Sequence, residues 1–501
     1  MARLGIAMDL GTSGIRAEAI DLSTGEVLST VMTLRHPLPG LNVMDQIRIV
    51  LARGLDFVNE IMIRAINRVI GELGIPVDQV SCFGVCGNPV QLSLFQGIDV
   101  WDLAYSGYRK LKSMGVTPAK REAVRIAASE IRGLTLPGAC EVVIPPAVRH
   151  EVGADALALI IQTGMLEKNE TAIAIDFGSN AEMAIFHEGV VVSGSAAAGP
   201  ALEEREISCG MAAASGAICD LNVEGLYHRL ILLDENLFPT QGPLIDFRVK
   251  GIVGGTDVPR PTGITGTGTI AIIQQAMAAG LINLPHIETM DRLLHLGDDV
   301  YMTQEDVSEA GKAIGAIRAG YMSLCQHGGI LPEEIHTAYL SGASGTYIDA
   351  VKAQKVGLIP PCVGEVFHVG NTSLAMAREL VIDPDKLDEM IELGDKIKDH
   401  HCMFASSETF KKIFLLELSY WTEGMPMSEY RRFLKRYGFV DLIPAKSTPE
   451  VFRTVTRDID DPGRHGLRII SDVHRERQEK SERAESEQKC LESVSSEDGS
   501  E

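Results

Sequence analysis

A short stretch near the start of the chain combines an acidic residue, small hydroxyl residues and glycines in an order suited to phosphate chemistry. An apolar run ends at Asp9, and the turn that follows contains Gly11, Thr12, Ser13 and Gly14. Glycines let main-chain N–H groups approach an anion closely, and the two hydroxyls add donors. A carboxylate at the end of such a strand is placed to hold a hydrated Mg²⁺ that bridges phosphate oxygens. Taken alone, the stretch is more typical of a polar β-hairpin turn.

The same pattern recurs in the middle of the chain. A second apolar run leads into Asp176, Gly178, Ser179 and Asn180. In both copies a second predicted strand, a glycine turn and a third strand follow. Repetition of a whole unit is stronger evidence than one motif. The sequence therefore predicts two related α/β domains that face each other across a phosphate-binding cleft.

Length and composition indicate a globular protein with more than one domain. The chain has 501 residues, of which 45% are hydrophobic and 23% charged, and this length suffices for two or three domains. The formal net charge of −22 disfavours non-specific binding to nucleic acid or to anionic membranes. No basic and apolar leader opens the sequence, and no apolar stretch is long enough to span a bilayer. We therefore expect a cytoplasmic protein with neither nucleic acid nor membrane as a partner.

The nine cysteines are scattered along the chain. They form no C-x-x-C pair and show no iron–sulfur spacing. Cys82 and Cys86 lie four residues apart in a predicted strand, so their side chains point to one face. We expect buried free thiols and no iron–sulfur cluster in this chain.

Alternating helical and strand patterns connect the two acidic turns and favour an α/β architecture. One helix is predicted over residues 46–73, with Asp45 as its cap, and a buried strand over residues 80–86. Asn88, at the next strand-to-helix junction, is either a helix cap or a polar contact in the cleft. Asp155, near the start of an apolar helix, is either a partner of the helix dipole or a cleft carboxylate.

Two glycine-rich junctions in the second half are candidates for contacts with a nucleoside. Gly266 and Gly268 lie at the start of a predicted helix, where bare N–H groups form a cradle for an anion or a ribose. The second junction follows a predicted strand, and its glycines allow a flat group such as adenine to pass close to the main chain. It consists of Gly342, Ala343, Ser344 and Gly345.

The remaining segments carry weaker signals. A helix is predicted over residues 307–326, in which Lys312 and Arg318 are solvated or capping charges. Residues 374–438 are predicted to be mostly helical, with an aromatic-rich run that we expect in the core. Beyond about residue 472 the sequence is rich in Glu, Ser and Arg without apolar periodicity, which predicts disorder.

Three motifs in order resemble the phosphate-1, phosphate-2 and adenosine motifs of the actin, sugar-kinase and heat-shock ATPase superfamily. They are Asp9-x-Gly-Thr-Ser, Asp176-x-Gly-Ser and Ser341-Gly-Ala-Ser-Gly. Within it, the sequence is most similar to the ATP-dependent reductive activases of corrinoid proteins, especially those that serve methylamine methyltransferases. The stretches that carry this resemblance are 86–96, 152–158, 195–200, 263–268, 311–318 and 417–426.

The resemblance implies duplicated actin-like ATPase domains of ribonuclease H-like fold that face a nucleotide cleft. We expect the first domain over residues 1–168 and the second, with a helical C-terminal part, over 169–445. A C-terminal extension is expected over 446–471 and a disordered acidic tail over 472–501.

The resemblance also implies ATP and Mg²⁺ as cofactors and assigns roles to the motif residues. Asp9 and Asp176 would be the catalytic residues and would organise magnesium with its water. Thr12, Ser13 and Ser179 would hold phosphates, and residues 342–345 would pack on adenosine. The glycines of the motifs and Asn180 would complete the nucleotide contacts.

The implied activity is repair of a corrinoid protein, by return of cobalt(II) to cobalt(I) for methyl transfer in methylamine-type methanogenesis. The family's methylamine-type members end in a ferredoxin-like domain with cysteine-ligated clusters, whereas Cys490 is the sole cysteine after residue 402 here. We therefore expect a separate ferredoxin or another reductant to supply the electron. The alternatives are a cluster-less paralogue that acts as an ATP-gated partner or chaperone, and a small-molecule kinase of the same fold.

Overall fold

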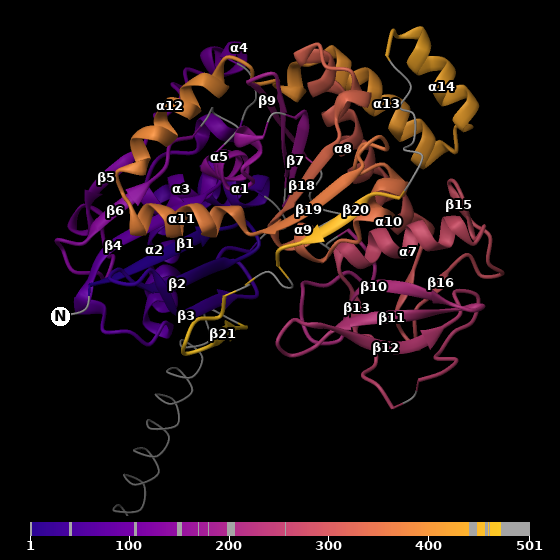
Figure 1. Ribbon diagram of the computed structural model, residues 1–501, viewed down its shortest axis with the longest axis horizontal. Coiled ribbons are helices and arrows are strands. Elements are labelled where there is room, and N and C mark those ends of the chain that lie inside the picture. The colour runs from indigo at the N-terminus through magenta and orange to yellow at the C-terminus, as the bar shows by residue number, and fades with distance from the viewer. Residues whose placement is uncertain are drawn as a thin grey trace, which may run out of the picture.

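The computed structural model describes most of the chain in a single continuous fold, shown in Figure 1. The residues described are 3–39, 43–104, 108–147, 153–168, 170–178, 180–197, 206–255, 257–439, 448–455, 459 and 461–471. Two mixed β-sheets form the centres of two lobes, and helices cover the faces of both sheets (Figure 1).

The first lobe is built on a seven-stranded sheet in the order β21-β3-β2-β1-β4-β6-β5. Three consecutive antiparallel strands begin it, and β4 and β6 then continue it in parallel with β1. Its strands are β1 (Leu4–Leu10), β2 (Ile15–Asp21), β3 (Glu26–Thr33), β4 (Val80–Gly87), β5 (Val124–Ala127), β6 (Glu141–Ile144) and β21 (Leu467–Ile470). The apolar residues of β1 and β4 are almost completely buried, as expected for central strands covered on both faces.

The second lobe repeats this arrangement in a six-stranded sheet of order β20-β19-β18-β7-β8-β9. Its strands are β7 (Ala172–Phe177), β8 (Ala181–His187), β9 (Val190–Ala196), β18 (Thr337–Ser341), β19 (Glu365–Gly370) and β20 (Glu450–Arg453). Again an antiparallel hairpin-plus-strand is followed by parallel strands on the other side of the first strand. The predicted duplication of an α/β unit is therefore confirmed.

The helices of the first lobe are α1 (Val43–Arg53), α2 (Leu55–Glu72), α3 (Pro89–Gln96), α4 (Tyr108–Ser113) and α5 (Ala154–Gln162). The single helix predicted over residues 46–73 is wrong, because Gly54 with φ 89° divides it into α1 and α2. Asp45 lies inside the first turn of α1 and pairs with Arg48 at 3.1 Å. It is therefore an acidic first-turn residue and does not occupy the capping position.

The second lobe carries additional strands and most of the later helices. The helices are α7 (Gly266–Ala278), α8 (Gln304–Gly328), α9 (Gly342–Tyr347), α10 (Ala350–Val356), α13 (Glu408–Glu423) and α14 (Met427–Arg436). A small sheet in the order β12-β11-β10-β13 consists of β10 (Ala217–Glu224), β11 (Tyr227–Leu233), β12 (Pro239–Ile245) and β13 (Gly263–Ile264). Two short hairpins follow: β14 (Ile282–Asn283) with β15 (His286–Ile287), and β16 (Leu294–His295) with β17 (Tyr301–Met302).

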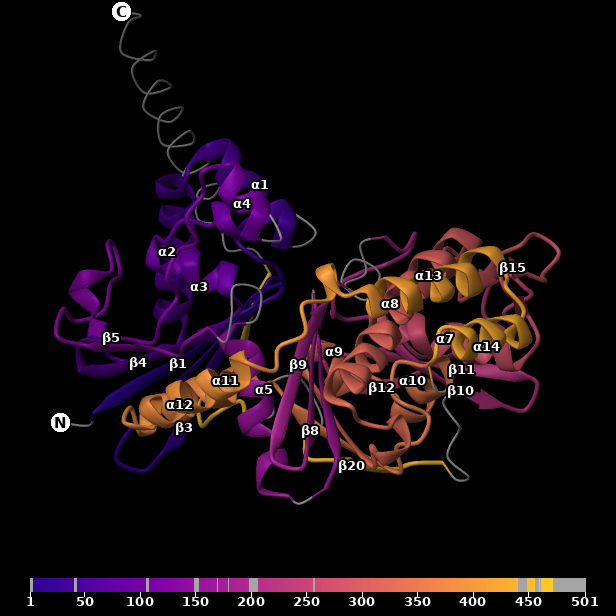
Figure 2. The same cartoon turned by 90° about the horizontal axis from the view of Figure 1, so that it is seen from above.

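Two C-terminal segments return to the first lobe. The helices α11 (Thr372–Ile382) and α12 (Lys386–Lys398) follow β19, and both views place them beside the first sheet (Figures 1 and 2). Arg378 of α11 forms an ion pair with buried Glu18 of β2. Later the chain adds β20 to the second sheet and β21 to the first. The domain boundary at residues 168 and 169 stays a prediction, but the helices after β19 tie the lobes together.

The core of the second lobe includes one charged pair that the sequence did not indicate. Arg318 of α8 lies 3.3 Å from Glu417 of α13, whose side chain is fully buried and also bonds to Tyr430. The prediction of a solvated or capping charge is therefore wrong for Arg318, because α13 packs directly over this part of α8. It holds for Lys312, which is exposed and pairs with Glu309. Trp421, from the predicted core run, is 1% exposed.

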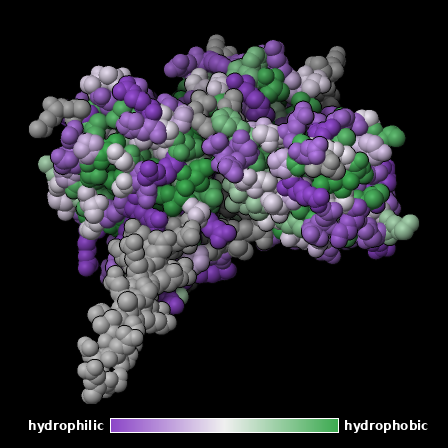
Figure 3. All heavy atoms as spheres, turned by 90° about the horizontal axis from the view of Figure 1, so that it is seen from below, coloured by the Kyte–Doolittle hydropathy of each residue, from purple (hydrophilic) through white to green (hydrophobic). Residues whose placement is uncertain are grey.

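The described cysteines are free thiols, and Cys82 and Cys86 are buried. On the face drawn in Figure 3, hydrophilic and hydrophobic residues are mixed and neither kind covers a whole lobe. Within the described ranges, no helix combines the length and apolar character required to cross a bilayer.

Candidate nucleotide site

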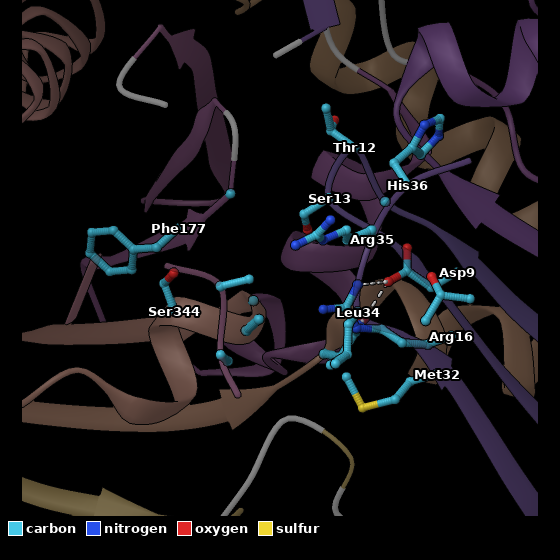
Figure 4. Close-up of a pocket in the computed structure, with 18 of the residues that line it drawn as sticks. Asp9, Thr12, Ser13, Arg16, Met32, Leu34, Arg35, His36, Phe177 and Ser344 are labelled. Carbon is cyan, nitrogen blue, oxygen red and sulfur yellow. Dashed lines mark hydrogen bonds and ion pairs between the residues drawn. The ribbon is translucent and has the colours of Figure 1, made fainter. Parts of the chain in front are cut away.

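A cavity of about 810 Å³ lies between the lobes, at the ends of β1 and β7 where the two acidic turns begin. Figure 4 shows Asp9, Thr12, Ser13 and Arg16 on one side of it, with Phe177 and Ser344 on the opposite side. Clefts of this size and mixed lining are typical of small-molecule sites.

Asp9 is buried near the end of β1 and is held from two directions. Arg16, its partner across the β1–β2 hairpin, lies 3.9 Å away through one guanidinium nitrogen. Asn371, at the N-terminus of α11, donates from Nδ2 to the Asp9 carboxylate at 2.8 Å. The carboxylate therefore has a fixed orientation and a cation beside it.

The turn after Asp9 is a compact loop with its polar side toward the cavity. The Gly11 N–H donates to the Gly14 carbonyl at 3.0 Å. A side chain at Gly14 would lie 2.6 Å from the Thr33 carbonyl oxygen, so only glycine fits this position. Thr12 and Ser13 line the cavity, and their contact with phosphates stays a prediction.

Asn88 serves both purposes that its position suggested. Its Oδ1 accepts from the N–H groups of Val90 and Gln91, so it caps α3. Its Nδ2 donates to Thr12 Oγ1 at 2.9 Å. The start of α3 is thereby fastened to the first acidic turn.

The second acidic turn has a different environment. Ser341 Oγ donates to Asp176 Oδ2 at 3.2 Å, and the Gly178 N–H donates to the Asn180 carbonyl. Gly342 has φ 83°, and a side chain there would lie 2.4 Å from Asp176 Oδ1. Glycine is therefore required where the adenosine-type motif meets the acidic turn. Ser179 lies outside the described residues.

Three carboxylates in the cavity have raised pKa values. Burial and the charge of Asp155 raise the pKa of Asp176 to about 7. Burial and the charge of Asp9 raise the pKa of Asp155 to about 6. Burial and the charges of Asp155 and Asp176 also raise the pKa of Glu182 well above its usual range. The cavity therefore concentrates negative charge and favours a bound cation.

Asp155 also serves both purposes proposed for it. It lies in the first turn of α5, where its Oδ1 accepts from the Ala156 N–H at 2.9 Å. It also lines the cavity. An acid in this place interacts favourably with the helix dipole while it contributes charge to the cleft.

The glycine-rich junctions are only partly in the cavity wall. Gly342, Ala343 and Ser344 line it, whereas Gly345 lies behind them and accepts from His368 Nδ1 through its carbonyl. At the other junction the lining residues are Thr265 and Thr267. The predicted residues Gly266 and Gly268 lie behind these threonines, and a Cβ at 268 would be 2.2 Å from the Ile218 carbonyl oxygen. Gly268 thus permits close packing of α7 on β10, and nucleotide contact by either glycine stays a prediction.

Four site residues were not identified from the sequence alone. Arg16, Arg35, Glu182 and Asn371 all line the cavity. A hairpin register would have placed Arg16 opposite Asp9 and Glu182 opposite Asp176, because each pair flanks a short turn. No hairpin register places Asn371, which reaches Asp9 because α11 crosses to the first lobe.

The side chains fit a nucleotide with a hydrated magnesium ion. Hydroxyl residues and glycines line the cavity, Arg16 and Arg35 supply positive charge, and both lobes contribute carboxylates. Within the described ranges, no three His, Cys, Asp or Glu side chains are arranged to ligate one ion directly. This agrees with Mg²⁺, which keeps several waters and binds through one or two carboxylates plus phosphates.

Comparison with known proteins identifies the family. The model of the RACo C-terminal domain, described as the ASKHA domain, matches residues 170–431, and the model of the RACo middle region matches residues 4–168. The chain belongs to the RACo family. The superfamily that the sequence resembled, and the actin-like fold of the lobes, are thereby confirmed.

Individual relatives of this RACo-family protein agree with the family assignment. It is 45% identical over 470 residues to the [Co(II) methylated amine-specific corrinoid protein] reductase of Methanosarcina barkeri, an alignment that covers 94% of this chain and 86% of the relative. It is 24% identical over 405 residues to the corrinoid activation enzyme RamQ of Eubacterium limosum, covering 73% and 62% of the two proteins.

A solved structure, the reductive activator for corrinoid, iron–sulfur protein, superposes on this RACo-family protein with a TM-score of 0.67. The sequences are 24% identical, and the match covers 83% of this chain and 66% of that one. This likeness independently supports the fold.

Proposed function

We propose that this protein is an ATP-dependent reductive activator of a corrinoid protein, which returns cobalt(II) to cobalt(I) for methyl transfer. The observation that carries the proposal is the 45% identity, over nearly the whole chain, to a corrinoid protein reductase. The duplicated acidic turns around one cavity supply the nucleotide machinery that such an activity requires. A methylamine-type methyl donor is the corresponding proposal for the physiological system.

Residues of both lobes would have separate roles in ATP hydrolysis. Asp9 would hold magnesium through water, and Thr12 and Ser13 would bind phosphates through hydroxyl and N–H groups. Bound magnesium would neutralise phosphate charge. Asp155 and Asp176, with pKa values of about 6 and 7, are suited to accept a proton from the attacking water near neutral pH.

We propose that the electron comes from a separate ferredoxin or another reductant, because this sequence has no run of cysteines with cluster spacing. The protein would then contribute ATP-driven changes in its complex with the corrinoid protein. Binding energy that favours the reduced form of the corrinoid shifts an otherwise unfavourable equilibrium. The cytoplasmic location expected from the sequence stays a prediction.

The test compares ATP turnover in the presence of different partners. Purified protein is assayed with a corrinoid protein in the cobalt(II) state, with the same protein in the cobalt(I) or methylated state, and with a panel of polyols and small acids. We expect stimulation by the cobalt(II) form alone, because an activator must distinguish the inactive state to avoid futile hydrolysis.

Two other results would favour the alternatives. Stoichiometric phosphorylation of a small molecule would identify a kinase. Binding of the corrinoid protein with equal turnover in every cobalt state would indicate an ATP-gated partner or chaperone. Either result contradicts the proposed activator.

A further inference from the structure

A buried chain of side-chain hydrogen bonds ends on the first acidic turn. His36 Nε2 lies 2.8 Å from Gln91 Oε1, and Gln91 Nε2 donates to Gln46 Oε1. Gln46 Nε2 in turn donates to the main-chain carbonyl of Thr12 at 3.1 Å. Gln46 and Gln91 are at most 1% exposed. This series of hydrogen bonds thus runs from the loop after β3, through side chains of α3 and α1, to the predicted phosphate-binding turn.

Main-chain groups at its two ends fix which atom donates and which accepts in every hydrogen bond of this series. At one end, the Leu38 N–H donates to His36 Nδ1 at 3.0 Å, so the ring proton must be on Nε2 and must point at Gln91. At the other end, the Thr12 carbonyl can only accept, so Gln46 must present its NH₂ group. The two ends therefore require the same orientation of the Gln46 and Gln91 amides. In that orientation each donor and acceptor in the series has its hydrogen-bond partner. A buried network of this kind specifies one geometry, because any reversal leaves a buried polar group unpaired.

The geometry of the peptide unit links this series of hydrogen bonds to the cavity. In a planar trans peptide the C=O and the following N–H point in opposite directions. When Gln46 holds the Thr12 carbonyl toward α1, the Ser13 N–H is turned away from α1. Ser13 itself lines the cavity. Figure 4 shows Thr12, Ser13 and His36 together at one edge of this cavity.

We propose that Gln46 is a positioning residue for phosphate binding, and that Gln91 and His36 act through it. They hold the Thr12–Ser13 peptide with its N–H directed at the phosphate of a bound nucleotide. None of the three side chains is required to touch the nucleotide. This inference rests on the proposed nucleotide function of the cavity.

The test is titration of Mg·ATP into the full-length protein by calorimetry, with KM and kcat of hydrolysis measured in parallel. Gln46→Leu and Gln91→Leu should each weaken the affinity about tenfold, the loss expected when one well-aligned hydrogen bond is removed. Gln46→Glu keeps the volume but has no N–H to donate, so it should weaken binding as much as Gln46→Leu. Gln46→Glu also tests the proposal if Gln46→Leu does not fold.

Two comparisons separate positioning from general stability. Because Gln91 acts through Gln46, the double variant Gln46→Leu/Gln91→Leu should bind Mg·ATP no more weakly than Gln46→Leu alone. Asn59→Leu is the matched control, since Asn59 Nδ2 donates to the Leu94 and Phe95 carbonyls at the other end of α3. This control should lower the Tm and leave the affinity unchanged.

Wild-type affinity in folded Gln46→Leu or Gln46→Glu would overturn the inference, and so would equal losses in Asn59→Leu. Failure of the proposed nucleotide function is distinguishable from both, because the wild-type protein itself would then show no binding of Mg·ATP.

Discussion

The acidic turns of the two lobes have the same place in the fold but opposite electrostatic surroundings. In the first hairpin Asp9 is registered across from Arg16, and in the second Asp176 is registered across from Glu182. Directly opposed residues of a hairpin have side chains on the same face. One carboxylate therefore has a cation beside it and the other has a second acid.

This difference gives the two carboxylates separate tasks. Asp9 lies beside Arg16 and accepts a hydrogen bond from Asn371, which suits a fixed anchor for a hydrated cation. Asp176 has a pKa raised to about 7 by burial and neighbouring acids, which suits exchange of a proton. The two halves thus share a scaffold, and the residue at one register position gives their carboxylates different surroundings.

The largest expected effect is loss of hydrolysis when either carboxylate is removed. Asp9→Ala and Asp176→Ala should each reduce Mg²⁺-dependent ATP turnover by at least about a hundredfold, because each removes a charge that organises the reacting groups. Circular dichroism should show an intact fold. The control is Asp78→Ala, an exposed acid outside the cavity, and full activity in either cleft variant would refute the assigned site.

A smaller effect is expected when the first turn loses its cation. Arg16→Met leaves the buried Asp9 carboxylate without its arginine, so we expect a loss of about 2 kcal/mol in the free energy of unfolding. Added Mg²⁺ should restore part of it, since a cation then returns to the same place. Thermal unfolding with and without Mg²⁺ measures both quantities. Arg48→Met, at an exposed ion pair, should change little, and equal losses in both variants would show that Arg16 has no special role.

The charge of Asp155 in the same cavity should control the pH dependence. Asp155→Asn removes a negative charge that raises the pKa of Asp176, so the rising limb of the pH–rate profile should move down by about one pH unit. The profile is measured between pH 5 and 9 at saturating Mg·ATP. Glu60→Gln, on an exposed part of α2, provides the reference. A limb that does not move would separate Asp176 from the proton-transfer step.

The smallest effect concerns stability in the absence of magnesium. Asp155 and Asp176 have folded-state pKa values of about 6 and 7, raised from 3.8. Their contribution to stability is therefore complete below pH 4 and is lost as pH rises to about 7. Asp155→Asn should remove on the order of 1 kcal/mol of this loss. Urea unfolding at pH 5 and pH 8 gives the difference, and an unchanged difference in the variant would contradict the raised pKa.

The fold was largely predictable because its signals are local. Alternating strands and glycine turns around Asp9 and Asp176 indicated a duplicated hairpin unit, and the structure confirms it. For Asn88 and Asp155 the sequence offered two alternatives each, a role at a helix N-terminus or a place in the cleft, and the structure shows that both hold. The break at Gly54 was missed because apolar periodicity continues on both sides of it.

The rest depended on contacts that sequence spacing does not encode. Arg318 has the surroundings of an ordinary helical charge until α13, a hundred residues later, supplies Glu417. Asn371 reaches Asp9 only through the crossing of α11 to the first lobe. The Thr12 carbonyl accepts a hydrogen bond from Gln46 of α1, and no sequence motif indicates this contact. These are long-range pairings, and each required the tertiary structure.

The most direct test of the activator is optical spectroscopy of cobalt in a purified corrinoid protein. The cobalt(II) protein is mixed anaerobically with this chain, Mg·ATP and an independent low-potential reductant. We predict conversion to the cobalt(I) spectrum that requires both this chain and ATP, and that fails with Asp9→Ala. A cobalt(II) spectrum that persists with every component present, or reduction that proceeds equally without ATP, would contradict the account.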